Sequence, residues 1–404
     1  MSVEIKEISK PSELKEFVKF GIRLYKNNPY YIPPLIDEEV ATLRKDKNPA
    51  FEEGCEAKYF MAYKNGKPAG TIAGIINYRA NRIWNNKLAR FGFVDFINDE
   101  EVSEALFHTV EEWARGKGME GIQGPMGFTD FDHQGMLIYG FDQLGTMATI
   151  YNYEYYPEHL ERLDFKKGYD AQEYKIWIPG AVPEKHIRIS ELVMKKYGLV
   201  IRKFKNKKEI MPYAHKIFEL LNRAYTPLEN FVPLSQRQID HYVNMYIPLL
   251  RYENVVTVFK EDTDEMVGVG ICIPSLAKAM QKAKGKFLPF GFIHLLKALT
   301  GKNDVVDLYL VAVAPEYQSK GVNALLFYDL IPIFIKNGYV YAESNPELES
   351  NGRVQSQWEY FERIHHKTRR IYVKTFDKKG KYKKYGRIIG TGRFAAYWRY
   401  LFGR

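Results

Sequence analysis

A polar loop at residues 318–323, QSKGVN, separates a buried apolar run from the start of an apolar-rich helical pattern. The first N–H groups of a helix have no acceptor within the helix, and the helix dipole favours negative charge there. Gly321 lets the backbone approach a ligand closely, and Lys320 adds a positive charge. The order of strand, loop and helix therefore predicts a binding site for a phosphate group.

Two acidic side chains lie on the strands expected beside this loop. Glu343 is near the end of a predicted strand at residues 339–344, and Asp307 lies on the strand before the loop. A buried carboxylate with a raised pKa suits a general base that accepts the proton of an amine nucleophile. Glu343 is the first candidate and Asp307 the second, and a structural role for Glu343 is the alternative. Cys55 and Cys272 are distant from these motifs, so we expect no covalent enzyme intermediate.

The elements that would position these residues occur twice along the chain. Each half predicts a strand, a helix, a hairpin, a strand, a helix and a strand in that order. A Pro/Gly-rich break at residues 178–183 separates the halves, so we expect two α/β domains with mixed (α+β) sheets, residues 1–180 and 181–404. The elements are expected at residues 2–9, 11–26, 57–78, 91–97, 99–117 and 121–128, and again at 199–205, 209–225, 254–273, 304–314, 321–336 and 339–344.

The loop resembles the Q/R-x-x-G-x-G/A signature of the GNAT superfamily, the GCN5-related N-acyltransferases. Gln318 and Gly321 match, and Asn323 departs from the usual Gly or Ala. The resemblance implies two tandem GNAT-like domains, of which the second binds acetyl-CoA or acyl-CoA and needs no metal. It also implies that the strand before the loop splays from its neighbour and pairs with the pantetheine arm. The cofactor-binding residues that it implies are Leu310, Val311, Ala312, Val313, Gln318, Ser319, Lys320, Gly321, Val322, Asn323 and Asn351.

The same resemblance implies a proton donor for the departing thiolate. Proteins of this superfamily often place a Tyr for this purpose in the helix that follows the next strand. We expect Asn351 to open that helix and Tyr360 to be the acid, with Trp358 or Phe361 as alternative occupants of the position.

A longer pattern, GP-x-x-F…G-x-L-x-x-GFD…YN-x-x-YY…GF, resembles a bacterial two-lobed branch of GNAT-like proteins. Residues 124–165 match it, except that Asp164 replaces the usual Gly, and RRIYVK at residues 369–374 resembles the same branch. We expect the first half to shape the substrate pocket. His133 is an alternative catalytic base or a hydrogen-bonded structural group. The expected lining residues are Asp130, Asp132, His133, Asn152, Tyr155 and Tyr156.

At the position in the first half that corresponds to the phosphate loop of the second half, the sequence does not resemble QSKGVN. Residues 98–105, NDEEVSEA, are acidic and contain no glycine. Carboxylates at the start of a helix would repel a pyrophosphate. We therefore predict that only the second half binds coenzyme A.

The composition is that of a globular protein with a basic surface. Hydrophobic residues make up 46% and charged residues 27% of the 404 residues, and the formal net charge is 59 − 49 = +10. Positive charge is concentrated at residues 195–208 and 377–404, which suits contact with phosphates, nucleic acid or an anionic membrane. Residues 276–303 are basic and then apolar, which fits packed helices, a helical lid or a segment lying on a membrane.

Other sequence features concern the location of the protein. Two well-separated cysteines favour a reducing cytoplasm. The charged first ten residues do not fit a signal peptide, and no apolar window reaches the roughly 18 residues of a membrane span. We expect a cytoplasmic protein, with peripheral contact at the inner membrane surface as an option.

The leading hypothesis is a coenzyme A-dependent N-acyltransferase that moves an acetyl or longer acyl group to the amine of a small-molecule or lipid-like substrate. A lipid-directed long-chain enzyme of the bacterial ceramide synthase kind is one alternative. A non-catalytic acyl-CoA-binding protein and an aminoacyl-tRNA-dependent transferase are the others. No helix-turn-helix pattern or zinc-ligand spacing occurs in the sequence, so nucleic acid is not an expected partner.

Overall fold

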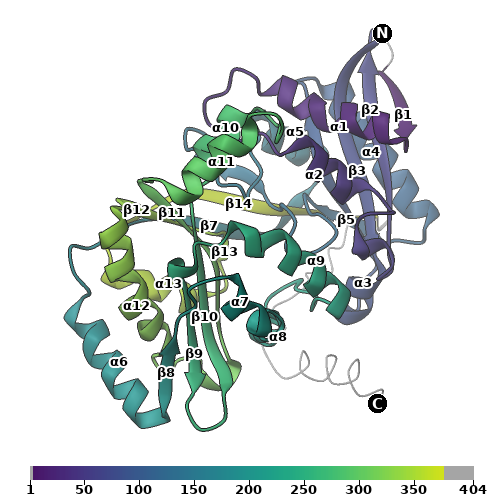
Figure 1. Ribbon diagram of the computed structural model, residues 1–404. Coiled ribbons are helices and arrows are strands. Elements are labelled where there is room, and N and C mark those ends of the chain that lie inside the picture. The colour runs from purple at the N-terminus through teal and green to yellow at the C-terminus, as the bar shows by residue number, and fades with distance from the viewer. Residues whose placement is uncertain (1–2, 377–404) are drawn as a thin grey trace.

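Figure 1 shows the computed structural model of the protein, which describes residues 3–376 apart from the side chains of residues 353, 354 and 356. The basic segment at residues 377–404 lies outside the described residues. The strands are β1 Val3–Ile8, β2 Cys55–Lys64, β3 Lys67–Asn77, β4 Leu88–Phe96, β5 Gly121–Gly124, β6 Met136–Tyr139, β7 Lys166–Trp177, β8 Leu199–Arg202, β9 Val255–Lys260, β10 Glu265–Pro274, β11 Val305–Val313, β12 Tyr341–Ser344, β13 Glu347–Leu348 and β14 Arg363–Thr375. The helices are α1 Pro11–Leu24, α2 Ile36–Leu43, α3 Tyr78–Trp84, α4 Glu100–Gly116, α5 Tyr155–Arg162, α6 Glu184–Tyr197, α7 Lys207–Ile210, α8 Ala214–Tyr225, α9 Gln236–Tyr246, α10 Ala277–Ala283, α11 Gly291–Thr300, α12 Val322–Asn337 and α13 Gly352–Gln355.

The described strands form one mixed sheet (Figure 1). Its order is β1-β2-β3-β4-β5-β14-β7-β12-β11-β10-β9-β8, with β6 beside β14 and β13 beside β7. The order is nearly symmetric about the β14–β7 pair, because β4 and β5 are parallel on one side and β11 and β12 are parallel on the other. The two halves of the chain therefore repeat one strand arrangement, as the duplicated sequence pattern predicts.

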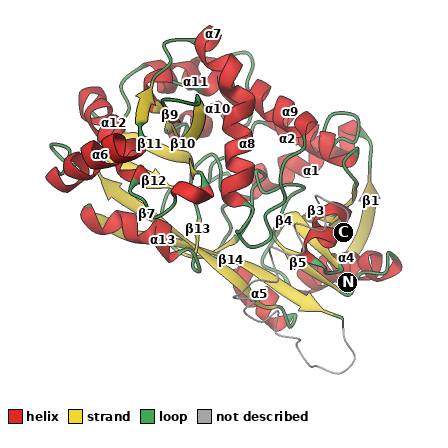
Figure 2. Cartoon of the chain, turned by 90° about the horizontal axis from the view of Figure 1, so that it is seen from below, coloured by secondary structure: helices red, strands yellow, loops and turns green. Residues whose placement is uncertain are grey.

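The halves exchange strands at the centre of the sheet. β7, from the first half, pairs with β12 of the second half, and β14, near the end of the chain, pairs with β5 of the first half. β7 and β14 also pair with each other, and Figure 2 shows them as the long strands that join the two halves. The predicted domain boundary at residue 180 therefore separates two halves that each contribute a strand to the sheet of the other.

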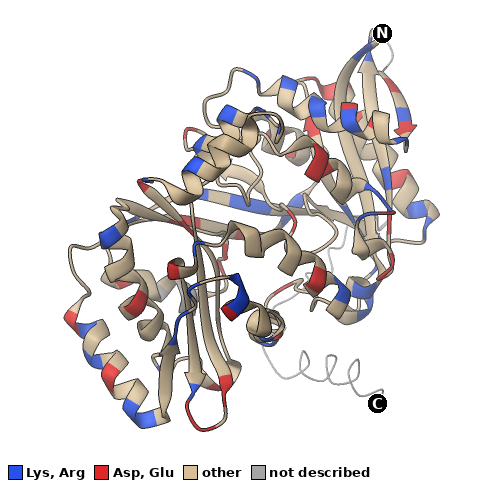
Figure 3. Cartoon of the chain, viewed as in Figure 1, with Lys and Arg blue, Asp and Glu red and all other residues tan. Residues whose placement is uncertain are grey.

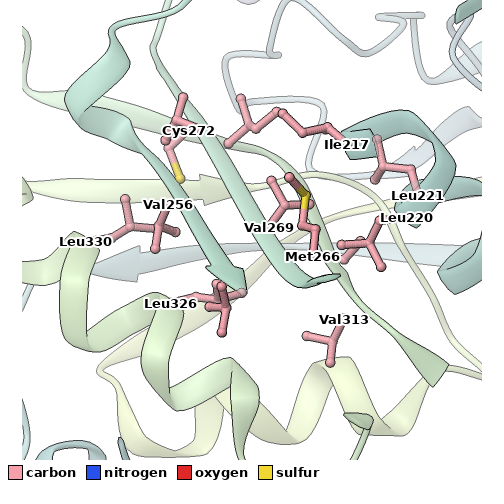
Figure 4. Close-up of a cluster of buried hydrophobic side chains, with 14 of the residues drawn as sticks. Ile217, Leu220, Leu221, Val256, Met266, Val269, Cys272, Val313, Leu326 and Leu330 are labelled. Carbon is pink, nitrogen blue, oxygen red and sulfur yellow. The ribbon is translucent and has the colours of Figure 1, made fainter. Parts of the chain in front are cut away.

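Helices cover both faces of the sheet. In the second half α8 packs against β10 and β11, whereas α12 packs against β9 and β10 and carries α6 on its outer side. Figure 4 shows this core, with Ile217, Leu220 and Leu221 of α8 on one side of the strands and Leu326 and Leu330 of α12 on the other. Burial of these apolar side chains on both faces is the main stabilising term of the fold.

Most expected elements are present within a few residues of their predicted ends. The helix expected at residues 209–225 is divided into α7, a 3-10 turn and α8, because Pro212 lacks the N–H that a continuous helix needs. The helix expected to begin at Asn351 is also shorter, since α13 ends at Gln355 and a 3-10 segment, Ser356–Tyr360, follows. The packed pair expected at residues 276–303 is confirmed as α10 and α11.

The loop that follows β6 lies closely on β14, and one glycine permits this contact. Gly140 has a φ of +87°, and a Cβ there would overlap the backbone carbonyl of His366. We predict that Gly140→Ala lowers the free energy of unfolding by at least ~2 kcal/mol, because left-handed strain adds to the overlap. Gly180→Ala, whose Cβ position has nothing within 4 Å, is the matched control and should change it by under ~0.5 kcal/mol. Urea unfolding measures both, and equal losses would contradict the assigned contact.

Candidate active site at the open edge of β11

β11 and β12 separate beside the predicted ligand site. They pair in parallel only from Val305 opposite Tyr341 to Leu308 opposite Ser344. Beyond this point β12 ends, whereas β11 continues to Val313 and stays paired with β10. Within the described chain, the edge of β11 at residues 309–313 therefore has no neighbouring strand on the β12 side. The divergence that the family resemblance implied is confirmed.

Side chains bond the backbone carbonyls along this open edge. Each of these side chains donates a hydrogen bond to a carbonyl oxygen of β11. The amide N–H groups of an extended ligand could bond the same carbonyl oxygens. Tyr225 and Asn345 were not among the predicted site residues. The bonds run from Asn345 Nδ2 to Tyr309 O (2.5 Å), from the Tyr225 hydroxyl to Val311 O (2.8 Å) and from Gln318 Nε2 to Val313 O (3.2 Å).

The predicted phosphate loop follows directly after this edge. Ser319 and Gly321 have φ angles of +62° and +85°, and α12 begins at the next residue. The backbone N–H groups of residues 319 and 321–323 have no acceptor among the residues that the structure describes. Ser319 and Lys320 are exposed, so this turn presents amide groups and a lysine at the positive end of a helix.

Neighbouring elements hold the start of α12 in place. A Cβ at Gly321 would lie 2.8 Å from Cγ2 of Ile189 in α6, so the glycine serves this packing as well as the turn. Asn323, which departs from the family signature, is the second residue of α12. Its side-chain amide donates to Gln357 Oε1 at 3.3 Å. The asparagine at this position therefore links α12 to the 3-10 segment that precedes β14.

A buried cluster of charges lies on the central strands. Glu173 on β7 is opposite Lys367 on β14, both side chains are 0% exposed, and Lys367 Nζ is 3.1 Å from Glu173 Oε2. Arg369 donates to the other oxygen of Glu173 and to the carbonyl of Ile150. Burial alone would raise the pKa of Glu173, but the positive charges of Arg369 and Lys367 outweigh it and lower the pKa to about 2.

Glu343, the first candidate for the base, belongs to this charged cluster. Its Oε2 lies 3.3 Å from Lys367 Nζ and 2.9 Å from His366 Nε2. Its register neighbour on β11 is Asp307, which is also buried. Neither carboxylate oxygen of Asp307 makes a hydrogen bond of ordinary geometry with a described residue. Burial and the nearby charge of Glu343 raise the pKa of Asp307 to about 7.

Sequence reasoning missed the basic residues of this cluster. His366, Lys367 and Arg369 lie in the run HHKTRR, which is flanked by Ile364 and Ile371. A run of positive charge inside a strand with an apolar end is a usable signal, since lysine and arginine are almost never fully buried without a partner. The partner residue Glu173 is far away in the sequence, so only the register of β7 and β14 identifies the pair.

An apolar cavity of about 20 Å³ lies next to the open edge. Asp307 is on the face of the sheet that borders this cavity, because its register partner on β10, Ile273, contributes to the cavity wall. The wall contains no charged side chain among the described residues, which suits an acyl group. The lining residues come from α8, α9, β10, β11 and the turn after α9: Ala214, Ile217, Phe218, Val243, Tyr246, Ile247, Leu250, Ile271, Ile273, Tyr309 and Leu310.

Several first-half residues expected to line a substrate pocket use their polar atoms within the fold. The Asn152 amide accepts from the N–H of Leu137 at 2.7 Å and donates to its carbonyl at 3.0 Å. The Tyr156 hydroxyl accepts from the N–H of Phe96 at 3.0 Å, and the Tyr155 hydroxyl donates to the carbonyl of Phe96 at 2.5 Å. These bonds hold the three residues within the fold, and their roles as substrate-lining residues stay predictions.

The loop at residues 128–135 brings the other first-half candidates toward the second half. Asp130 accepts from the N–H of Val232 at 2.9 Å, and His133 Nε2 lies 2.9 Å from the carbonyl of Met147. Asp132 accepts from two N–H groups of its own loop. Burial raises the pKa of Asp130 to about 6 and lowers the pKa of His133. Their roles as substrate ligands stay predictions.

The predicted acid and cofactor asparagine lie outside the charged cluster. Tyr360 is 48% exposed, and its hydroxyl accepts a hydrogen bond from Lys185 Nζ in α6 at 2.6 Å. The N–H of Asn351 donates to the carbonyl of Leu348 at 2.8 Å, just before α13. The contacts of Tyr360 are thus with α6 rather than with Glu343 or Asp307.

In the first half, the edge that corresponds to the open edge of β11 is closed by main chain. β4 and β5 pair in parallel only over residues 88–90 and 121–123. Directly beyond, the N–H of Met126 donates to the carbonyl of Phe91 at 2.8 Å. The next helix, α4, is capped by Asp99, whose carboxylate accepts from the helix itself. This arrangement favours the hypothesis that coenzyme A binds only to the second half.

Comparison with solved structures identifies the fold. One match is the GCN5-related glucosamine N-acetyltransferase region of a fungal multi-domain GH3 beta-N-acetylglucosaminidase, with a TM-score of 0.53 and 11% identity over 92% of this chain and 38% of that longer one. Another is a tandem GNAT protein from the clavulanic acid biosynthesis pathway, with a TM-score of 0.52 and 12% identity over 93% and 98% of the two chains. The chain therefore has the tandem GNAT fold.

Two curated relatives match across both halves of the chain. It is 26% identical over 379 residues to the bacterial ceramide synthase of Caulobacter vibrioides (strain NA1000 / CB15N), covering 91% of this chain and 96% of that protein. It is 24% identical over 368 residues to Protein YghO of Escherichia coli (strain K12), covering 90% and 93%. No protein-family profile matches the chain. Fold and relatives together support N-acyltransferase activity in general.

The charged cluster yields a stability prediction. Glu173→Gln should lower the free energy of unfolding at neutral pH by about 3 kcal/mol, because it leaves Lys367 and Arg369 buried without their carboxylate. Glu349→Gln, which removes a half-exposed ion pair with Lys167, is the matched control and should cost less than about 1 kcal/mol.

The pH dependence of this loss follows from the lowered pKa of Glu173. The carboxylate stabilises the fold fully above the ordinary glutamate pKa of about 4.3 and loses that effect as the pH falls toward about 2. Urea unfolding at several pH values should therefore show the gap between parent and Glu173→Gln narrowing below pH ~4. A gap that is constant with pH would contradict the assigned ion pairs.

Proposed function

We propose that the protein is a coenzyme A-dependent N-acyltransferase that transfers an acyl group from acyl-CoA to the amine of a lipid-like acceptor. The observation that carries the proposal is the open edge of β11 ending in the loop at the start of α12. An extended edge can pair with the amides of a pantetheine arm, and the helix start can hold its diphosphate. The free amides of residues 319 and 321–323 and the side chain of Lys320 would make the diphosphate contacts.

The carboxylates beside the edge supply the proton chemistry. The amine nitrogen attacks the thioester carbonyl, a C–N bond forms, and the C–S bond breaks to release the coenzyme A thiolate. Asp307 is the better proton acceptor, because Glu343 is held by Lys367 and His366. The thiolate then takes a proton from a phenol; Tyr225 lies at the open edge, and Tyr360 is the second candidate.

The nature of the acceptor is inferred from the relatives and from the apolar cavity. The relative from Caulobacter vibrioides carries the name ceramide synthase, which supports a lipid-like amine as the acceptor. The cavity of about 20 Å³ has room for one or two waters by this measure, so an acyl group much longer than acetyl requires α8 and α9 to move apart. The free thiols of Cys55 and Cys272 support a reducing, cytoplasmic location.

A non-catalytic acyl-CoA-binding protein is the second candidate function. It is favoured by the depth of Asp307, which is 2% exposed, and by the contact of Tyr360 with Lys185. Both functions share the binding site at the loop and differ in turnover.

Binding at the loop can be tested by reversing one charge. Lys320→Glu should weaken coenzyme A binding by at least about tenfold, because it places a carboxylate beside the diphosphate at an exposed position. The matched control is Lys336→Glu in the last turn of the same helix, which should bind like the parent. Titration calorimetry with coenzyme A compares the three proteins. Equal affinities would mean that the diphosphate lies elsewhere.

The identity of the base can be tested by a pH profile. In the parent protein, thiol release from acyl-CoA in the presence of a long-chain amine should increase as the pH rises through about 7, because Asp307 must be ionised to accept a proton. Asp307→Asn should lower kcat by about a hundredfold and remove this dependence, with coenzyme A affinity unchanged. Asp304→Asn, at the exposed start of the strand, is the control. If Asp307→Asn keeps the pH dependence of the parent protein, Glu343 is the general base instead. If the parent protein releases no thiol, the second candidate function, non-catalytic acyl-CoA binding, is favoured.

A further inference from the structure

A group of large apolar side chains is exposed at the turn between α10 and α11 and along α11. Of the twelve large hydrophobic residues that are exposed in the described chain, five lie within residues 287–296, here called the apolar tip. Leu288 and Phe290 are 68% and 69% exposed, the highest values of the twelve. The other three are Phe287, Phe292 and Leu296. So compact a group of exposed apolar side chains marks an interaction surface rather than ordinary scatter.

The charge around the apolar tip has a single sign. Residues 275–303 contain six lysines and no acidic residue. The lysines are all exposed, and Figure 3 shows the blue positions on α10 and α11. They are Lys278, Lys282, Lys284, Lys286, Lys297 and Lys302.

The inner side of the α10–α11 pair is fixed to the first half. Gln281 Nε2 donates to the carbonyls of Pro29 and Tyr31 at 2.8 and 3.0 Å, and the N–H of Ile36 donates to the carbonyl of Gly285 at 2.9 Å. Buried apolar residues of both helices also pack against Met147, whose carbonyl holds His133. Figure 1 shows the pair lying across the junction of the two halves, on the side of α1 and α2. Among the residues that the structure describes, none therefore covers the apolar tip after these contacts are made.

We propose that the apolar tip and its lysines form a docking surface for an anionic phospholipid membrane. Apolar side chains that enter the acyl boundary and lysines that meet phosphate headgroups are the two components of interfacial binding. A protein partner with an acidic rim and a second copy of this chain are the competing occupants. A second copy would place like charges opposite each other, because the lysine-rich surface would meet itself. The proposal deepens the lipid-directed part of the proposed function, since a docked tip would bring the junction of the halves next to a lipid amine.

The test is co-sedimentation of the full chain with vesicles, which needs no turnover and so succeeds or fails independently of the proposed reaction. One vesicle set is phosphatidylcholine alone, and the other is an equal mixture of phosphatidylcholine and phosphatidylglycerol. The protein should pellet with the mixed vesicles, and the pelleted fraction should fall as salt is added. Equal binding to both vesicle sets, or no binding to either, would overturn the proposal.

Variants of the apolar residues locate the surface. The double variant Leu288→Asp/Phe290→Asp should lower the partition coefficient on mixed vesicles at least about tenfold. Leu192→Asp/Ile335→Asp changes the charge equally at exposed positions on α6 and α12 and should bind like the parent. The basic segment 377–404 is present in every variant. A difference in partition coefficient between the two double variants therefore measures the contribution of the apolar tip. Equal partitioning of the two double variants would overturn the proposal.

Lysine variants test the electrostatic part and serve where the aspartate variants fail to fold. Lys278→Gln/Lys282→Gln/Lys286→Gln should reduce binding to mixed vesicles by at least about tenfold. Lys195→Gln/Lys207→Gln/Lys208→Gln, from the other described basic segment, is the control and should retain most of the binding. Sedimentation equilibrium without vesicles examines self-association. A dimer that the apolar variant dissociates would assign the surface to a second copy and overturn the proposal.

Discussion

The pairing of Glu173 with Lys367 and Arg369 is the constraint on which the arrangement of the two halves depends. Charges removed from water cost several kcal/mol each unless their partners are placed accurately. Glu173 and Lys367 are completely buried and opposite each other on β7 and β14, so these strands tolerate one register only. A shift by one residue would turn the lysine to the other face of the sheet. Because β12 pairs with β7, the same register also sets where Glu343 and Asp307 lie.

The two halves share a strand order but have diverged at the edge that matters for a ligand. Beside β11 the edge is open, whereas beside β4 the main chain at Met126 occupies it. The first half instead contributes a loop that covers β14. At Gly135 a Cβ would lie 2.9 Å from Cβ of Arg369, and Asn152 fastens the returning chain to Leu137. Gly135, Gly140 and Asn152, three positions of the sequence pattern that resembles the two-lobed branch, are therefore explained by how this loop lies on β14.

Local signals in the sequence were enough to predict much of the fold. Asn65-Gly66 located the first hairpin, and the order of apolar strand, glycine loop and helix located β11, the loop and α12. The exchange of β7 and β14 was not predictable, because no local pattern states which distant strand will be the neighbour. The residues of the candidate site likewise fall into those that local sequence patterns predict and those that only the tertiary structure brings together. Gln318 and Gly321 follow from short spacing, whereas Tyr225, Asn345 and His366 reach it only through tertiary packing.

The strand exchange has a consequence for how the chain is made. β5 needs β14 as its neighbour, yet nearly two hundred and forty residues separate Gly124 from Arg363. While the ribosome is still producing the second half, the first half has an incomplete sheet with an unpaired edge, which other nascent chains could join. The sheet of the first half can be completed only after β14 has been made, and contacts at such long separation in sequence form slowly. Until β14 pairs with it, the free edge of β5 favours aggregation.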